Sequence, residues 1–172
     1  MTLTKAHRWI GIGMFCAALI ATAAAQGSRG KAELKAGSGN ITVDFGRPSL
    51  KGRDMLSQLQ EGDFWRMGMN QATVLTTPVD LMFGATKVPK GSYSLWLKRQ
   101  GDNFVLVFNS QTGQWGTSHD PSKDVYSVTL KKEALSGPVE TFTIDLKPAA
   151  KGGQFSLSWG STNLLADFTF AG

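Results

Sequence analysis

Three arginines lie close together in the chain and could bind an anion. Arg47, Arg53 and Arg66 fall within a stretch of twenty residues. A guanidinium group grips a carboxylate or phosphate with two parallel hydrogen bonds, and a neighbouring indole can stack on a sugar ring. We therefore expect a ligand-binding site formed by the cationic, aromatic and amide side chains of this stretch. These residues are Arg47, Lys51, Arg53, Trp65, Arg66 and Asn70.

The same stretch also carries four carboxylates, which leaves a structural alternative open. They are Asp44, Asp54, Glu61 and Asp63. Four cations balanced by four anions within residues 44–66 would suit internal ion pairs that hold long loops against a core. The direction in which the three arginines point separates the two interpretations.

A tryptophan between two glycines is a further candidate for ligand contact. Trp115 lies in residues 113–116, where the flanking glycines allow a sharp turn that can leave the indole at a loop tip. An exposed indole would contact a carbohydrate or a protein, whereas a buried one would cover one end of the core. Trp96 lies on the strand face opposite Leu95 and is exposed if that face meets water.

The sequence offers no complete catalytic set. His119 is the only histidine after residue 25, and its neighbours Ser118 and Asp120 would point to opposite sides of an extended segment. We expect His119 to lie in a loop beside a tyrosine or tryptophan, and we assign no catalytic residue, metal ligand or cofactor. Residues 120–124 could offer oxygen ligands to calcium, but they carry fewer such ligands than a known calcium-binding loop. Glycoside hydrolysis needs two carboxylates, for which the candidates are Asp44, Asp54, Glu61, Asp63, Asp120 and Asp124.

The elements that must position these residues are β-strands. Apolar and polar residues alternate in the way expected of antiparallel strands with one solvated face. The alternating segments are residues 41–45, 93–97, 125–130, 142–146, 155–159 and 168–170. Residues 104–108 are apolar throughout, which suits a central strand buried on both faces. Residues 72–77 and 79–83 add two candidates on either side of Pro78.

About nine strands with almost no helix predict an all-β domain. We prefer an antiparallel two-layer, jelly-roll-like β-sandwich over residues 40–172, with a closed β-barrel as the alternative. Residues 100–103 predict the turn of a hairpin. Only residues 54–60 and 131–135 show a short helical pattern. The polar, glycine-bearing residues 26–39 predict a flexible leader.

The N-terminus predicts export. A basic start with Lys5 and Arg8 precedes an apolar run from Trp9 to Ala25, which ends in the small residues that a signal peptidase recognises. We expect residues 1–25 to be a signal peptide cleaved after Ala25, leaving a periplasmic or secreted protein without a membrane span. Cys16 lies inside the run, so lipidation is not expected. Removing Lys5 and Arg8 lowers the net charge from +5 to +3, which does not indicate nucleic acid as a partner.

Several short motifs, taken in their order and spacing, resemble a known family. The motifs are Gly46-Arg47-Pro48-Ser49, Lys51-Gly52-Arg53, Trp65-Arg66 with Gly68 and Asn70, Pro89 with Gly91 and Tyr93, Phe108-Asn109, Gly113-Gln114-Trp115-Gly116, and Val139-Glu140 with Phe142. Together they resemble the bacterial exported domain-of-unknown-function family 2911 over roughly residues 29–170. The resemblance implies export and a β-rich fold, and it names no activity.

These observations favour a non-catalytic, exported β-sandwich that binds a ligand or partner in the cell envelope. A glycan, an anionic small molecule or an envelope protein would suit the arginines, with Trp115 as a further contact residue. The alternatives are a two-carboxylate hydrolase of envelope polysaccharide and a purely structural envelope protein.

Overall fold

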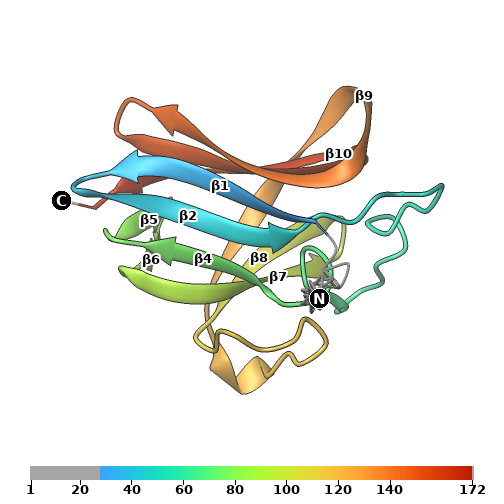
Figure 1. The fold of residues 1–172 in the computed structure, drawn as a ribbon, viewed down its shortest axis with the longest axis horizontal. Helices are drawn as coiled ribbons and strands as arrows, with labels where there is room; N and C mark the ends of the chain where they lie inside the picture. The colour runs from blue at the N-terminus through green and yellow to red at the C-terminus, as the bar shows by residue number, and fades with distance from the viewer. Residues whose placement is uncertain (1–27, 172) are drawn as a thin grey trace, which may run out of the picture.

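The computed structural model describes residues 28–171 and consists almost entirely of β-strands (Figure 1). The strands are β1 (Arg29–Ala36), β2 (Gly39–Gly46), β3 (Phe64–Trp65), β4 (Thr73–Thr77), β5 (Leu81–Phe83), β6 (Thr86–Val88), β7 (Gly91–Gln100), β8 (Asn103–Asn109), β9 (Asp124–Ala149) and β10 (Gly152–Phe170). The only helical element in the described residues is a 3₁₀ turn, Pro121–Lys123. Gln100 pairs with Asn103 across a two-residue turn, which confirms the predicted hairpin.

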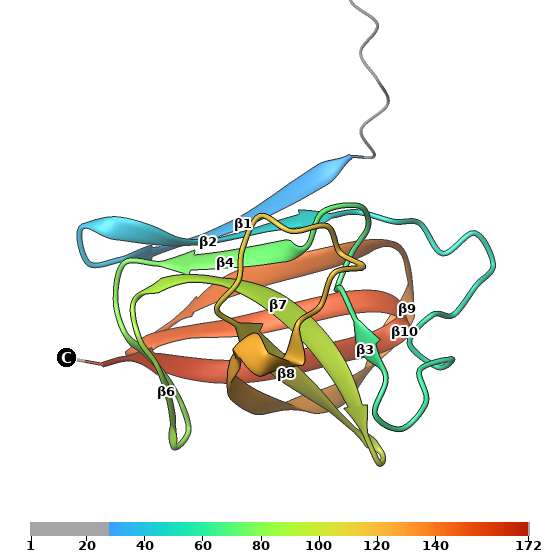
Figure 2. The same ribbon diagram turned by 90° about the horizontal axis from the view of Figure 1, so that it is seen from below.

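The strands form one antiparallel sheet that folds over into two layers. Their order is β1-β2-β4-β7-β8-β9-β10-β5-β6, and β3 pairs with β7. The fold-over lies in β9, because its first residues pair with β8 and later ones with β10. Seen from below, β7 and β8 cross over β9 and β10 (Figure 2). The end strands β1 and β6 do not pair with each other, so the sheet is not closed into a barrel, and the preferred sandwich-like fold is confirmed.

The ribbon formed by β9 and β10 bends back on itself. The register shifts on both sides of Gly160, whose φ is +59°. Beyond this bend the end of β10 returns to its start, where the Phe170 N–H donates to the Lys151 carbonyl at 2.9 Å. A Cβ on Gly152 would lie 2.1 Å from the Phe168 carbonyl oxygen, so the backbones touch there and only glycine fits.

Three segments differ from their sequence predictions. Residues 131–135 lie in β9 rather than in a helix, because pairing with β10 overrides the helix propensity of these residue types. Of residues 54–60, only 55–58 have an assigned structure, a turn. There Asp54 accepts a hydrogen bond from the Ser57 N–H at 3.2 Å, but the segment is too short to propagate a helix. The predicted leader, residues 26–39, contains the whole of β1.

β1 belongs to the sheet because one of its faces is apolar. It pairs with β2 along its full length, from Arg29 opposite Gly46 to Ala36 opposite Gly39. Of its three inward side chains, Ala32, Leu34 and Ala36, two are alanines, so the apolar alternation of this strand is weak in the sequence. The predicted signal peptide and its cleavage site lie outside the described residues. Within residues 28–171, no helix has the length and hydropathy needed to cross a bilayer.

The buried apolar side chains form two clusters, of which the larger holds the layers together. The main core lies between the layers and includes Ile41, Val43, Phe45, Phe142, Ile144, Leu146, Phe155 and Leu157. A smaller cluster on the outer face of β7 and β8 contains Ala72, Trp96, Val105 and Val107. β8 is therefore buried on both faces, as predicted. Trp96 is only 2% exposed, so the face around it does not meet water.

Candidate functional site

Three of the predicted site residues meet in one pocket. The pocket has a volume of about 180 Å³, and we call it the arginine pocket. Its lining residues are Pro48, Ser49, Leu50, Arg53, Met55, Trp65, Arg66, Gly68, Met69 and Trp159. Two cationic side chains thus stand beside two tryptophans and two methionines, which combines anion-binding groups with an apolar wall.

One wall of the pocket is the Trp65 side chain, which strand β3 directs inward. β3 pairs Trp65 with Leu97 of β7, and because side chains alternate along a strand, Phe64 faces the outer cluster while Trp65 faces the main core. The indole of Trp65 stacks on Trp159 with 5.2 Å between ring centroids and 10° between planes. It also meets Phe142 edge to face at 5.0 Å. These contacts fix the ring that a ligand would meet.

Residues 48–50 also line the pocket, and they are tied to β9. The Leu50 N–H donates to the Glu140 carbonyl, and the Phe142 N–H donates to the Pro48 carbonyl, both at 2.9 Å. The indole N–H of Trp159 donates to the same Glu140 carbonyl at 3.2 Å. Trp65 and residues 48–50 are therefore both anchored to strands of the sheet.

A tight turn after Arg66 holds the base of its side chain. Met67 and Asn70 have φ values of 51° and 63°, in the left-handed region. Asparagine tolerates this region, whereas a methionine there stores strain of about 1–3 kcal/mol. The turn packs on Gly46, where a Cβ would lie 2.3 Å from the Met69 carbonyl oxygen. Asn70 thus shapes the turn and does not line the pocket.

The three arginines have no carboxylate partner within residues 28–171. No ion pair of the described chain includes Arg47, Arg53 or Arg66. The four carboxylates of the same stretch bind other groups: Asp44 binds Arg29, Asp54 the Ser57 N–H, Glu61 the Gly101 N–H, and Asp63 the Gln60 N–H. The internal ion-pair interpretation is therefore wrong for these arginines. Arg47 and Arg53 are exposed, and Arg66 is half-buried.

Four of the predicted site residues lie outside the pocket. Arg47 lies over β1, since a Cβ on Gly30 would come within 2.8 Å of its Cδ. Lys51 stands on an exposed turn with φ 48°, and its N–H donates to the Glu140 carboxylate at 3.0 Å. Trp115 is 52% exposed and pairs with Gln71 in an isolated β-bridge. Asn70 contributes only to the turn described above. The predicted site is thus divided, with Arg53, Trp65 and Arg66 at its centre.

Sequence reasoning missed the apolar half of the pocket. Met55, Met69 and Trp159 line it beside the arginines. Met55 and Met69 lie in the same stretch as the arginines and could have been included on that ground. Trp159 could not, because nothing in its strand pattern indicates that it stacks on Trp65.

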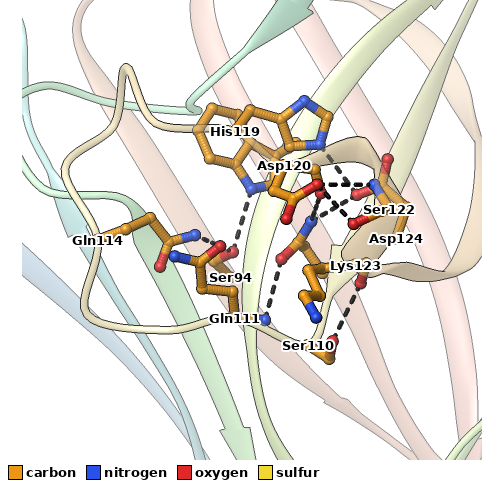
Figure 3. A network of polar contacts seen from close by, with 11 residues as sticks. Ser94, Ser110, Gln111, Gln114, His119, Asp120, Ser122, Lys123 and Asp124 are labelled. Carbon is orange, nitrogen blue, oxygen red and sulfur yellow. Dashed lines mark hydrogen bonds and ion pairs between the residues drawn. The ribbon is translucent and has the colours of Figure 1, made fainter.

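The aromatic and polar residues around His119 form a second cluster, on the outer face of the sheet (Figure 3). The imidazole lies between Phe64 and Trp96, with ring centroids 4.3 and 4.5 Å away. Its Nε2 is 2.9 Å from Oδ1 of Asp124, which also accepts a hydrogen bond from Nδ2 of Asn109 at 2.7 Å. His119 is thus a loop residue beside a tryptophan, as predicted. We call these five residues the His119 cluster.

The six carboxylates considered for hydrolysis are each bound to another group. Asp120 accepts hydrogen bonds from the hydroxyl and the N–H of Ser122. These bonds, the hydroxyl first, hold the pKa of Asp120 below its ordinary value of 3.8, so it stays ionised and is unsuited to act as a general acid. Asp124 is bound by Asn109 and His119. None of the six lines the arginine pocket.

Comparison with known proteins identifies the family and no individual relative. No curated protein and no solved structure matches the chain. The family DUF2911, described as a protein of unknown function, matches residues 28–168. The match runs from the start of the described chain into β10 and so includes every residue of the arginine pocket and the His119 cluster. The chain therefore belongs to the DUF2911 family, as its motifs predicted.

Proposed function

We propose that this protein is an exported binding protein whose arginine pocket takes the carboxylate of a sugar acid, such as one in an envelope glycan. One observation carries the proposal: Arg53 and Arg66 line the same pocket, and neither has a carboxylate partner in the described chain. A half-buried cation without a counter-ion is unfavourable, so the pocket favours an anionic ligand.

The size and walls of the pocket favour a ring that bears one acidic group. A volume of about 180 Å³ corresponds to about six water molecules at ~30 Å³ each, which is close to the size of one sugar unit. Trp65, half-buried and stacked on the buried Trp159, supplies an apolar surface of the kind that contacts the C–H face of a sugar. Arg53 at the exposed rim and half-buried Arg66 would each donate to the carboxylate.

The cellular compartment belongs to the same proposal. The basic start, apolar run and small residues of positions 1–25 support secretion with cleavage after Ala25, either to the periplasm or out of the cell. Mass spectrometry of the protein purified from its natural host should find Gln26 as the first residue. A chain that retains Met1 would contradict the export part of the proposal.

Calorimetric titration with sodium glucuronate tests the pocket. We expect Arg53→Ala and Arg66→Ala each to weaken binding by about 10- to 100-fold, because a hydrogen bond to a charged group contributes about 1.5–3 kcal/mol. Glucose, which lacks the carboxylate, should bind far more weakly than glucuronate. The matched control is Arg47→Ala, which removes an equally unpaired arginine outside the pocket and should leave the affinity unchanged.

Two results would contradict the proposal. One is a wild-type protein that fails to bind glucuronate at millimolar concentration. The other is an equal loss of affinity in Arg47→Ala and Arg66→Ala, which would indicate a diffuse attraction between charges. Thermal unfolding of each variant checks that the fold survives, and Arg66→Met serves as a second variant if Arg66→Ala does not fold.

A further inference from the structure

The loop between β8 and β9 covers the outer face of the sheet beside the arginine pocket. We call residues 110–123 the covering loop. Its backbone joins the segment that follows Arg66: the Gly116 N–H donates to the Asn70 carbonyl at 2.8 Å, and the Ala72 N–H donates to the Gln114 carbonyl at 3.2 Å. The Gln114 side-chain amide donates to the Ser94 hydroxyl of β7 at 2.9 Å. Figure 3 shows this loop arching over the side chains that anchor it.

The covering loop forms a close-fitting surface behind Arg66. A Cβ on Gly116 would lie 2.3 Å from Cδ and 3.1 Å from Cβ of Arg66, and 2.7 Å from the Asn70 carbonyl oxygen. There is no space for a methyl group between the loop backbone and the arginine stem. The stem of Arg66 is therefore held on one side by Gly116, and Arg66 is one of the residues that line the pocket.

The loop also holds β3 from outside. β3 has only two residues, Phe64 and Trp65, and pairs with β7 alone. On its inner side Trp65 stacks on Trp159, and on its outer side Phe64 packs against the imidazole of His119 with the rings tilted by 40°. A strand this short has few backbone hydrogen bonds, so these two ring contacts determine where it lies.

The His119–Asp124 pair fixes the end of the loop. Nε2 of His119 lies 2.9 Å from Oδ1 of Asp124, and the two side chains are 11% and 21% exposed. Nδ2 of the fully buried Asn109 donates to the same oxygen at 2.7 Å and to the Asp120 carbonyl at 2.8 Å. Both ends of the covering loop are thereby tied to the same point of the sheet.

We propose that the covering loop positions Arg66 and Trp65 for ligand binding, with Gly116 and the His119–Asp124 pair as its positioning residues. This inference rests on the binding function proposed above. A free arginine side chain has about 2 kcal/mol of rotamer entropy, which a ligand would have to overcome. Gly116 removes part of that freedom before the ligand arrives, and such preorganisation raises affinity without adding a contact.

The test compares two disruptive variants with a conservative one. Gly116→Ala places a methyl group against the arginine stem, and Asp124→Ala removes the acceptor shared by His119 and Asn109. We expect each to weaken glucuronate binding by about tenfold. Asp124→Asn retains an oxygen that can accept both hydrogen bonds, so it should stay within about twofold of wild type. Ile144→Val, which trims the core away from the loop, controls for lost stability and should bind normally.

A second measurement reports on Arg66 without any ligand. In ¹⁵N-labelled protein the Nε–H signal of Arg66 is identified by its absence in Arg66→Met. Gly116→Ala should shift and broaden that signal while the backbone spectrum outside the loop stays the same. If the wild type fails to bind glucuronate, the proposed function fails, and this signal alone decides the positioning role. Folded Gly116→Ala and Asp124→Ala proteins with unchanged Arg66 signals would overturn it.

Discussion

The arginine pocket and the His119 cluster contain the two neighbouring residues of β3, Trp65 and Phe64, and both combine aromatic with ionisable side chains. In the pocket, Arg53 and Arg66 stand beside the stacked pair of Trp65 and Trp159, without a carboxylate partner in the described chain. In the His119 cluster, the imidazole, the carboxylate of Asp124 and the amide of Asn109 bind one another. Aromatic and ionisable side chains therefore meet in both places, but among the described residues only the ionisable ones of the His119 cluster are paired with one another. What separates the two is whether their polar groups already have partners.

The two regions also differ in strain and burial. The turn after Arg66 contains Met67 at φ 51°, an unfavourable conformation for a methionine, and leads to a half-buried cation. Asn109 is fully buried, yet each of its polar atoms has a partner. Unfavourable features without a structural benefit are typical of sites that act on a ligand. This contrast predicts that substitutions in the two regions change stability in opposite directions.

The largest effect should follow from Asn109→Ala in the His119 cluster. The substitution removes the donor to Asp124 and Asp120 and the acceptor for the Gln111 N–H. Each buried group left without a partner costs about 1–3 kcal/mol, so we expect the free energy of unfolding to fall by about 3 kcal/mol or more. Denaturation by urea measures the change.

A matched control for this variant is Ser110→Ala. Ser110 is the next residue along the chain and is exposed, and its hydroxyl donates only one long hydrogen bond, 3.2 Å to the Lys123 carbonyl. It should change stability by less than about 1 kcal/mol. If Asn109→Ala lowered the free energy of unfolding as little as this control, the His119 cluster would not be a structural element and would not differ from the pocket in this respect.

A smaller effect of opposite sign should follow from Arg66→Met in the pocket. Methionine retains the unbranched stem that packs on Gly116 and removes the charge that has no partner. We expect stability to rise by up to about 1 kcal/mol while glucuronate binding weakens by about 10- to 100-fold. Urea denaturation and calorimetry measure the two quantities on one preparation. A loss of more than about 1 kcal/mol would instead make Arg66 a structural residue.

Much of the sheet could be predicted from the sequence, and the two failures have different causes. Alternation identified β2 through residues 41–45, and the apolar run 104–108 identified β8 as a strand buried on both faces. β1 was missed because its inward side is mostly alanine, and residues 131–135 were read as helical because their pairing with β10 is not local. Local patterns cannot report a pairing partner that lies far along the chain.

The same limit applies to the pocket. Arg53, Trp65 and Arg66 could be identified because they are close in sequence and their types suit an anion. The stacking of Trp159 on Trp65, and the choice between ion pairs and open arginines, both depend on how distant strands come together. The residue types of the pocket were thus predictable, but whether the arginines form internal ion pairs was not.

The smallest expected effect is on the pH dependence of stability. Ser122 holds the pKa of Asp120 below its ordinary value of 3.8, so the ionised carboxylate stabilises the covering loop above that pH, and the contribution is lost as pH falls through the lowered pKa. Asp120→Asn still offers an oxygen to Ser122 but does not titrate, so it should lose less stability than wild type between about pH 5 and pH 3. Urea midpoints at both pH values measure this. Asp102→Asn, at an exposed hairpin turn outside the cluster, should behave like wild type. If Asp120→Asn also behaved like wild type, the hydrogen bonds of Asp120 would contribute no pH-dependent stability to the covering loop.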